Sequence, residues 1–460
     1  MPKDMSKYGL IMNPFPSGGY FPLDSEYEST YAKIIVGKRD VVEKIQNFIT
    51  DFLNESTVPV IFIVGDYGFG KTHLLKHIQY AVQEAAKNIF PVYIKNIGEP
   101  RIIRLYKAVL DGIYARLGLD FLASAAKNIS KKAKKIEMIK RIFPDIAKII
   151  PKISSKDHNA IRWLFGEKIG NDAMRSIGVI REITDENAVD ALIALIRLIY
   201  YGKNYRLLIL VDELESIIGG VDNDELRRFY EGIRTIIDKT LKEAQFVFTA
   251  PPAIITGKDS ISFLHPALYS RLFRSVIELK ELDESSAKIL IREYLAKFRK
   301  PNMQTVLDPL YPFTEDAIAT IYKETRGVPR RLLQLANVVL EEADKRNLRE
   351  INAVFVDRLI KGSIEEKQEV EDETKKIIKE VIEERKIEEE VEKLQDLKPL
   401  QKEIIKVLKK NNNSLALGEL SRKIGLPYGD TKKTVFKMQS LGILSIIRRG
   451  PGYRVFLSIT

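Results

Sequence analysis

The segment from Gly65 to Thr72, Gly-Asp-Tyr-Gly-Phe-Gly-Lys-Thr, constrains the fold of this chain more than any other. It follows an apolar, β-branched run at 58–64 and precedes a helical pattern that begins at His73. The glycines let backbone N–H groups turn inward around phosphate oxygens, Lys71 can reach the β- and γ-phosphates, and the Thr72 hydroxyl can bind Mg²⁺ at the positive end of a helix. A glycine-rich turn that binds nothing would need neither Lys71 nor Thr72. The segment therefore predicts a strand, a phosphate-binding loop and a helix.

A second strand pattern supplies two carboxylates for the same site. The apolar run that ends at Val211 is followed directly by Asp212 and Glu213. A carboxylate at the tip of a buried strand can hold the Mg²⁺ shell together with Thr72, and an adjacent glutamate can orient or deprotonate an attacking water. The alternative is that the pair merely begins a helix. Beside a phosphate loop, it favours a hydrolytic site with Lys71, Asp212 and Glu213 as catalytic residues.

Strand and helix patterns alternate through the first part of the chain. Further strands are expected at 90–96, 245–249 and 275–279, and this alternation predicts an α/β domain with a parallel sheet. No strand pattern occurs between about 119 and 201, which indicates a helical insertion. At the end of the strand 245–249, the Thr249 hydroxyl is a candidate contact for the γ-phosphate. Arg271 and Arg274 precede the last strand, where an arginine either tethers the domain surface or reaches a neighbouring subunit's γ-phosphate.

The end of the chain has the pattern of three helices and a β-hairpin. Helices are expected at 400–408, 417–424 and 431–441, and strands at 444–449 and 453–458 around a Gly-Pro-Gly turn. This order predicts a winged helix, with the third helix in the major groove of duplex DNA and the hairpin on phosphates or in the minor groove. The candidate DNA-binding residues are the basic ones of the third helix and hairpin: Lys432, Lys433, Lys437, Arg448, Arg449 and Arg454. A protein-interaction module is the alternative.

Charge is unevenly distributed along the 460 residues, whose net charge is +11. Residues 398–460 contain 13 basic and 3 acidic residues, and residues 121–160 contain 10 and 3, whereas 361–397 contain 8 and 14. The excess of basic residues in 398–460 and in 121–160 favours two surfaces that face polyanions. For 121–160, a solvated lysine-rich face is an equal alternative. There is no cysteine, no long apolar run and no secretory pattern at the start, so a cytoplasmic location is expected.

These patterns divide the chain into five parts. We expect an N-terminal arm at 1–30, an α/β base domain at 31–282 with its helical insertion, and a helical lid domain at 283–362. A charged helix at 363–397 would serve as a spacer, and the winged helix would occupy 398–460.

The order of motifs along this chain resembles that of AAA+ ATPases of the origin-recognition and initiator clade. These motifs are the phosphate loop, the Asp212-Glu213 strand, the polar strand tip, the arginines, Gly327-Val328-Pro329-Arg330 and the C-terminal domain. A narrower likeness is to BREX ATP-binding proteins of the BrxD type and their archaeal relatives. It rests on the phosphate loop, on Trp163-Leu-Phe-Gly-Glu167 and on Val211-Asp-Glu-Leu-Glu-Ser216. The resemblance implies an α/β P-loop AAA+ fold, with a parallel sheet flanked by helices, a helical lid and a winged helix.

The resemblance also assigns roles within an ATP and Mg²⁺ site. It implies that Val36 and Gly37 lie against the adenine, that Thr249 is sensor one and Arg330 sensor two, and that Arg271, or else Arg274, is the arginine finger. Asn96 would restrain Glu213 until a partner binds. The loop and its helix start would contact nucleotide through Gly65, Asp66, Tyr67, Gly68, Phe69, Gly70, Lys71 and Thr72 of Walker A, and through His73.

The expected function is that of an ATPase whose nucleotide state sets the geometry of a winged helix on duplex DNA, in replication initiation, genome defence or DNA remodelling. The expected partners are double-stranded DNA and a second subunit that supplies or receives the finger, most simply in a homo-oligomer, without a membrane. Two alternatives remain: a DNA translocase or helicase-associated motor, and a signalling or transcription regulator in which nucleotide is a switch.

Overall fold

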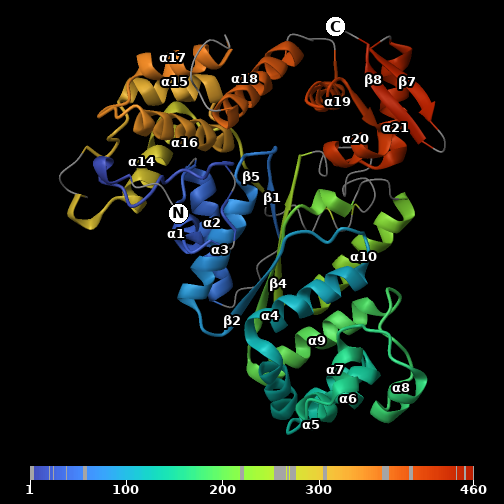
Figure 1. Cartoon of the computed structure of the whole chain (residues 1–460). Coiled ribbons are helices and arrows are strands. Elements are labelled where there is room, and N and C mark those ends of the chain that lie inside the picture. Colours follow the sequence, from blue (N-terminus) through green and yellow to red (C-terminus); the bar gives the residue numbers. More distant parts are fainter. Residues whose placement is uncertain are drawn as a thin grey trace.

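The computed structural model describes residues 5–458, except for 20, 24, 38, 55–59, 218–221, 253–265, 267–268, 270–275, 304–307, 365–371, 393–396, 442 and 450–451. Figure 1 shows a central sheet with helices on both sides, an insertion at one end, a helical lid beside the sheet and a small C-terminal domain above it. Among the helices of the described residues, none combines the length and the hydropathy needed to cross a bilayer.

The central sheet contains five parallel strands in the order β2-β3-β4-β1-β5. All five lie where the sequence predicts strands, and they are β1 (Ile61–Val64), β2 (Ile89–Ile94), β3 (Arg206–Val211), β4 (Ala244–Ala250) and β5 (Val276–Glu278). Because the strands are parallel, their carboxyl ends meet at one edge. The phosphate loop after β1 and the acidic pair after β3 therefore share that edge.

Side-chain alternation divides the sheet between two cores. Phe62 and Ile209 point to the face covered by α4 (Ile102–Ile129), α9 (Ala188–Lys203) and α10 (Asn223–Lys239), whereas Ile63 and Leu210 point to the face covered by α2 (Arg39–Leu53) and α3 (Lys71–Ala85). Successive residues of a strand face opposite sides, so runs that are apolar throughout indicate burial on both faces. This explains why the strands read as continuous apolar segments.

The helical insertion extends the core of one face of the sheet. It comprises the second half of α4 and α5 (Ala133–Lys140), α6 (Pro144–Ser154), α7 (His158–Leu164), α8 (Asn171–Ile177) and α9. Its apolar side chains belong to the same continuous cluster as those of the sheet face, and the buried Trp163 donates from Nε1 to the Arg181 carbonyl oxygen at 2.9 Å. Gly118 interrupts α4 with φ 70°, and the insertion starts at this break.

The lid contains α14 (Glu284–Phe298), α15 (Glu315–Thr325), α16 (Pro329–Lys345) and α17 (Ala353–Ile364). The N-terminal arm, with a 3₁₀ turn at Ser6–Tyr8, and α1 (Glu28–Ala32) with the residues just after it complete the lid core. Their side chains in that core are Met5, Tyr8, Leu10, Phe15, Tyr31 and Ile34. The Tyr8 hydroxyl donates to the Leu348 carbonyl oxygen at 2.9 Å, and Asn337 Nδ2 donates to the Phe15 carbonyl oxygen at 2.6 Å. The arm therefore packs on the lid, about 300 residues further along the chain, and also on α3 of the base domain, where Glu28 pairs with Lys76 at 3.0 Å.

Helix α18 (Asp372–Glu392) lies where the sequence predicts a charged helical spacer, and it packs on the domains at both of its ends. Ile378 and Ile382 are part of the lid core, and Ile387 and Val391 are part of the C-terminal core. Its carboxylates form ion pairs with both neighbours: Glu388 with Arg331 of the lid at 2.7 Å, and Glu384 with both Arg331 at 2.7 Å and Lys410 at 3.1 Å. The helix thus joins the two domains as a packed element.

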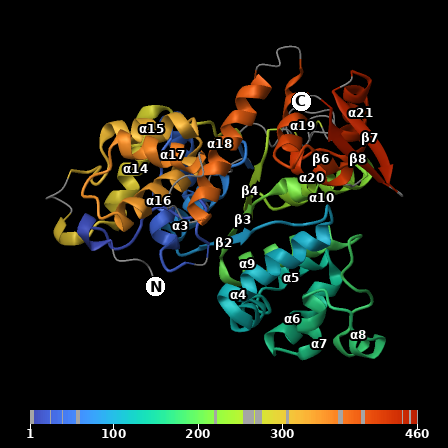
Figure 2. The same cartoon turned by 45° about the horizontal axis from the view of Figure 1, so that its top comes forward.

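The C-terminal domain has the helices and the hairpin that the sequence predicts, together with a short third strand. Its elements are α19 (Pro399–Lys409), β6 (Ser414–Ala416), α20 (Leu417–Ile424), α21 (Tyr428–Ser440), β7 (Leu444–Arg449) and β8 (Gly452–Leu457). The strands form an antiparallel sheet in the order β6-β8-β7. Figure 2 shows this domain over the end of the central sheet, next to α10.

We predict that Arg331→Ala destabilises the contact between the lid and α18. Arg331 is 5% exposed and is bound by Glu384 and Glu388. Its removal takes the arginine from Glu388 and leaves Glu384 with Lys410 alone, which costs about 2–4 kcal/mol. Thermal unfolding and amide hydrogen exchange of α18 measure the loss. The control is Arg292→Ala, which removes an exposed pair with Glu293 and changes stability by less than about 0.5 kcal/mol. Equal effects of the two variants would contradict the prediction.

Candidate nucleotide-binding site

The phosphate loop connects β1 to α3 through two glycines in the left-handed region. Gly68 has φ 88° and Gly70 has φ 91°, a conformation that side chains disfavour. A Cβ on Gly68 would also lie 3.1 Å from Arg330 Cβ, whereas the space around Gly70 is open within 4 Å. The glycines therefore serve two purposes: Gly68 permits close approach of the lid, and Gly70 leaves the start of α3 open to an anion.

Lys71 folds back over the loop. Its Nζ donates to the carbonyl oxygens of Gly65 at 2.7 Å and Asp66 at 3.1 Å. Burial lowers the pKa of Lys71, while the carboxylates of Glu215, Asp212, Asp66 and Glu213 favour its charged form. The ammonium group is thus held at the loop by weak carbonyl acceptors that phosphate oxygens can replace.

Asp212 is the centre of a hydrogen-bond network that links three strands to the phosphate loop. It is 2% exposed, and its Oδ2 accepts from Thr72 Oγ1 at 2.6 Å and from the Tyr93 hydroxyl at 3.1 Å. Its Oδ1 accepts from Thr249 Oγ1 and, at 3.1 Å, from the Glu213 backbone N–H. Asp212, Thr72 and Thr249, predicted from the sequence, are therefore in direct contact.

Tyr93 is the residue of this network that the sequence prediction missed. It lies in β2, next to β3, and its hydroxyl reaches across to Asp212. Burial is the main cause that raises the pKa of Tyr93, and the Asp212 carboxylate raises it further. The available signal was a tyrosine within an otherwise apolar strand. Asn96, which the resemblance implies restrains Glu213, is exposed and forms no hydrogen bond with Glu213 among those of the described residues, so that role stays a prediction.

Glu213 lies at the surface of the site in a strained backbone conformation. Its φ is 50°, and its N–H donates to Thr249 Oγ1 at 3.0 Å as well as to Asp212. The network thus fixes the backbone, while the side chain is exposed to solvent and lines the same cavity as Lys71. This position suits a carboxylate that acts on water. Thr249 binds the carboxylate network, so its role as a γ-phosphate sensor stays a prediction.

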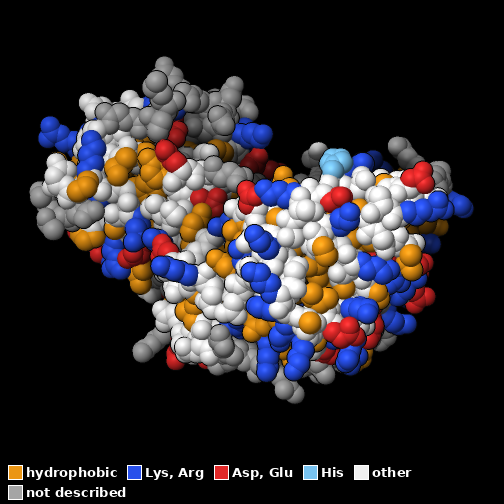
Figure 3. Space-filling view, turned by 90° about the horizontal axis from the view of Figure 1, so that it is seen from below, with side chains coloured by type: hydrophobic (Ala, Val, Ile, Leu, Met, Phe, Trp, Pro, Cys, Tyr) orange, Lys and Arg blue, Asp and Glu red, His pale blue; other side chains and the backbone are white. Residues whose placement is uncertain are grey.

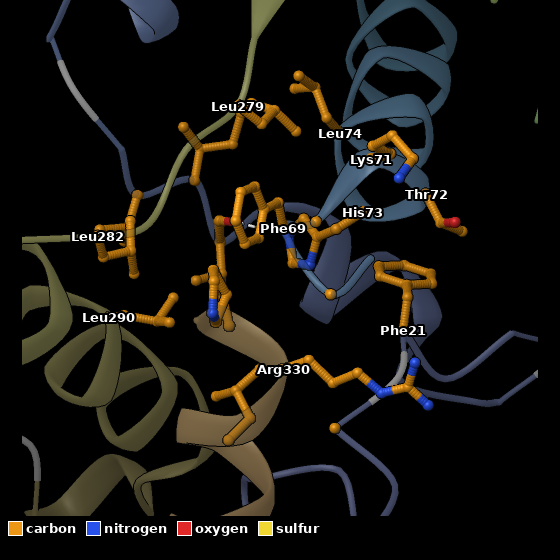
Figure 4. A pocket seen from close by; sticks show the side chains of 18 of the residues that line it. Phe21, Phe69, Lys71, Thr72, His73, Leu74, Leu279, Leu282, Leu290 and Arg330 are labelled. Atoms are coloured by element: carbon orange, nitrogen blue, oxygen red, sulfur yellow. Dashed lines mark hydrogen bonds between the residues drawn. The ribbon is translucent and has the colours of Figure 1, made fainter. Parts of the chain in front are cut away.

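A cavity of about 250 Å³ extends from the phosphate loop to the lid. Figure 4 shows Leu279, Leu282 and Leu290 on one side of it and Lys71 and Thr72 on the other. Val36 lines this cavity, and Gly37 borders an adjoining pocket, so the predicted adenine contacts lie beside apolar side chains. Phe21 of the arm also lines the cavity and packs edge-on against His73 at 5.1 Å.

His73 helps to anchor α3 to the segment before α2. Its Nε2 lies 2.6 Å from the Ile34 carbonyl oxygen, and burial lowers the pKa of His73 to about 4. The neutral ring therefore donates to that oxygen. His77 makes the equivalent contact with the Ala32 carbonyl oxygen at 2.8 Å, and burial lowers its pKa as well. Both histidines act as packing residues here.

Arg330 stands where the lid meets the phosphate loop. Its backbone N–H donates to the Gly68 carbonyl oxygen at 3.2 Å, and its guanidinium lies 4.4 Å from the centre of the Tyr67 ring. Burial lowers the pKa of Arg330 to about 10, so the group is a cation near neutral pH. A Cβ on Gly19 of the arm would lie 2.3 Å from the Arg330 carbonyl oxygen, so the arm packs tightly behind this arginine. The predicted sensor-two arginine thus lines the cavity opposite Lys71.

The residues fit a Mg²⁺–nucleotide site. Thr72 and Asp212 place a hydroxyl and a carboxylate oxygen 2.6 Å apart, and both are hard oxygen ligands of the kind Mg²⁺ prefers. Arg271 and Arg274 lie outside the described residues, so the arginine finger stays a prediction.

The predicted DNA-binding residues fall on two faces of the C-terminal hairpin. Lys432 Nζ lies 4.8 Å from the Tyr453 ring, which packs edge-on against Phe436, and Arg448 is paired with Tyr453 across the hairpin. Lys433 and Lys437 of α21 are also exposed, and Lys433 Nζ lies 3.4 Å from Asp430 Oδ1. Arg454 lies on the opposite face and donates to Ser414 Oγ at 3.3 Å, so the structure does not bring it to this surface. The side chain of Arg449 lies outside the described residues.

The basic insertion has an exposed but mixed surface. Figure 3 shows Lys and Arg side chains spread over the face seen from below, interrupted by acidic and apolar ones. Several of its basic residues are in ion pairs, among them Lys148 with Asp145 and Arg141 with Glu137. A second polyanion-binding surface stays a prediction.

The strand order, phosphate loop, acidic strand tip and helical lid together give the α/β P-loop fold that the resemblance to AAA+ proteins predicts, with a parallel sheet flanked by helices. A family model, BREX system ATP-binding protein BrxC/D, matches residues 153–334, which include Asp212, Glu213 and Arg330. This match supports the resemblance that the sequence motifs indicate. No curated protein sequence matches the chain.

Distant similarity to solved structures covers nearly the whole chain. The Orc1 protein of Aeropyrum pernix, solved in complex with DNA, is 12% identical, with 94% of this chain and 93% of that chain covered and a TM-score of 0.41. The ADP form of the Orc2 protein of the same organism is 14% identical, with 95% and 91% covered and a TM-score of 0.44. The Holliday junction branch migration motor RuvB of Thermotoga maritima is 14% identical, with 97% and 96% covered and a TM-score of 0.37.

We predict that Tyr93→Phe weakens Mg²⁺ binding to the nucleotide-loaded protein about tenfold, because Asp212 loses a hydrogen bond that orients it. The phenyl ring still packs beneath Lys76, whose Nζ lies 3.8 Å from the ring centre. Titration of Mg²⁺ against a fluorescent ATP analogue measures the effect. Tyr114→Phe is the control, since Tyr114 is 46% exposed and packs on Phe165. An unchanged Mg²⁺ affinity in Tyr93→Phe would refute the positioning role.

Proposed function

We propose that this chain is an ATP-dependent DNA-binding ATPase, in which the nucleotide sets the position of the C-terminal domain on duplex DNA. One observation carries the proposal: α18 belongs at once to the lid core and to the C-terminal core. A nucleotide held between base and lid fixes the angle between them. Because α18 is packed on the lid, a change in that angle also moves the C-terminal domain.

ATP would bind along the cavity between the base and the lid. Its phosphates would lie on the loop N–H groups and Lys71, its base against Val36 and the apolar wall, and Arg330 of the lid would contact the phosphates from the other side. Mg²⁺, held by Thr72 and through Asp212, would neutralise charge on the phosphate oxygens.

Hydrolysis would depend on Glu213, whose exposed carboxylate can orient and deprotonate water. Charge that develops on the γ-phosphate needs a further cation, which we assign to Arg271 or Arg274 of a neighbouring subunit. Turnover would therefore be slow in an isolated subunit and regulated by a partner or by DNA.

Duplex DNA is the proposed partner of the surface formed by α21 and the hairpin. Lys432 and Arg448 lie beside Tyr453, and Lys437 is exposed on the same helix as Lys432. Basic residues with an aromatic neighbour suit phosphate and groove contacts. The excess of 13 basic over 3 acidic residues in 398–460 adds long-range attraction.

The ATPase rate with and without duplex DNA separates this proposal from its rivals. A switch should hydrolyse ATP slowly and respond to DNA by changing state, whereas a processive motor should show steady turnover strongly stimulated by DNA. A signalling regulator should bind nucleotide and hardly turn it over under either condition.

We predict that Glu213→Gln binds ATP within about threefold of the wild type but hydrolyses it about 10²–10⁴ times more slowly, because the amide cannot accept a proton from water. Lys71→Ala should lose ATP binding itself. Equilibrium binding of labelled ATP and phosphate release measure the two steps, and Glu293→Gln in the lid is the control. Normal ATP turnover by Glu213→Gln would refute the assignment of Glu213 as the residue that activates water.

We predict that the triple variant Lys432→Ala, Lys437→Ala and Arg448→Ala weakens duplex binding at least tenfold and lowers the slope of log K against log salt by up to about 3. Fluorescence anisotropy at several salt concentrations measures both quantities. Arg454→Ala is the matched control, because this arginine lies on the other face of the hairpin. Similar losses in the triple variant and in Arg454→Ala would refute the proposed surface.

A further inference from the structure

The turn between α20 and α21 is seated on the ATPase base. A Cβ built on Gly425 of this turn would lie 3.1 Å from Pro251 Cγ and 3.6 Å from Glu215 Cβ. Pro251 follows β4 directly, and Glu215 stands two residues after Glu213. The turn therefore touches both segments that leave the carboxyl edge of the sheet at β3 and β4.

Helix α19 approaches the same edge from the lid side. Burial raises the pKa of Asp66 in the phosphate loop, and Lys406 of α19 lies close enough to oppose that rise. Loss of hydration also raises the pKa of the half-buried Glu403. Together with α20, this helix places the C-terminal domain over the catalytic edge, as Figures 1 and 2 show.

The covered segments on the base belong to the site. Glu215 lines the nucleotide cavity with Lys71, Asp212 and Glu213, and its Oε2 is buried with no hydrogen-bond partner among the described residues. An arginine finger that acts in trans comes from a second subunit, so it has to approach the γ-phosphate from outside the subunit that binds the nucleotide. A domain that packs on Pro251 and Glu215 would obstruct this access.

The covered turn of the C-terminal domain adjoins the segment that DNA needs. In a helix-turn-helix, the N-terminal residues of the second helix contact base edges in the major groove, and the first helix crosses the backbone. Here the turn at Gly425 precedes α21 by three residues and lies against the base. A duplex seated on the start of α21 would occupy the space now filled by the base.

We infer that the catalytic edge and the DNA-reading end of α21 mask each other, so that duplex DNA is the ligand that uncovers the ATPase edge for a second subunit. This inference rests on the proposed function. DNA competes with the base for the turn before α21, and its binding moves the C-terminal domain off Glu215 and Pro251. ATPase assembly is thereby restricted to chains that are already on DNA.

The test traps the contact with a disulfide. The chain has no cysteine, so Glu215→Cys with Gly425→Cys introduces the only pair. The Cβ separation of 3.6 Å lies within the range of about 3.5–4.5 Å that a disulfide requires. Each single variant controls for the loss of Glu215 or for the side chain at the left-handed position of Gly425, where φ is 67°.

We predict that the oxidised double variant binds duplex DNA at least tenfold more weakly than the same protein after reduction, and that DNA raises its ATPase rate only in the reduced form. Binding of a fluorescent ATP analogue in both forms reports an intact nucleotide site. Equal DNA affinity in the two forms, or no disulfide under mild oxidation, overturns the inference. Failure of the reduced and wild-type proteins to bind DNA refutes the proposed function instead.

Hydrogen exchange on the unmodified protein gives an independent measurement. If DNA displaces the base, the amides of 213–217 should exchange several-fold faster when a duplex is added, while those of α16 stay unchanged. Unchanged or slower exchange at 213–217 in a sample saturated with DNA would contradict the inference.

Discussion

The hydrogen bonds to the carboxylate of Asp212 hold the carboxyl edge of the central sheet together. A buried carboxylate is costly unless it is fully hydrogen-bonded. Asp212 accepts from three separate segments of the chain and from the N–H of the adjacent Glu213. Thr72 fixes the start of α3, Tyr93 the end of β2, and Thr249 the end of β4. These hydrogen bonds link the ends of β2, β3 and β4 to one another. They also fix the backbone of Glu213, whose N–H donates to Asp212 and Thr249. Hydrogen-bond networks of this kind are cooperative, so a change at the phosphate loop is felt at all three strand tips.

The sequence predicted the parts of the site that local chemistry determines. Gly68, Gly70, Lys71 and Thr72 are required together by one loop, and the strands are apolar on both faces, so their identity and direction followed from pattern alone. The prediction missed Tyr93 because a tyrosine in an apolar strand is usually a packing residue. Only the position of Tyr93 next to β3 reveals its hydrogen bond with Asp212.

Contacts between distant segments could not be predicted in this way. The apolar positions of α18 form one narrow seam, and nothing in the local pattern says that Ile378 faces the lid while Val391 faces another core. Nor does it say that the turn at Gly425 meets Pro251, because shape complementarity between domains leaves no periodic signal. The charged residues of α18 predicted a helix exposed to solvent. In the structure, its glutamates bind cations of the neighbouring domains: Glu384 binds Arg331 and Lys410, and Glu390 binds Lys409.

The arm that completes the lid has a consequence for synthesis of the chain. Tyr8 and its partner Leu348 are 340 residues apart, so at about 5–20 residues per second the ribosome needs roughly 20–70 s to supply the second after the first. During that interval Met5, Leu10 and Phe15 have no lid to cover them, and the base domain can fold while they wait. Closure of the chain on itself is therefore a late event, and the lid half of the nucleotide cavity matures after the half that carries the phosphate loop.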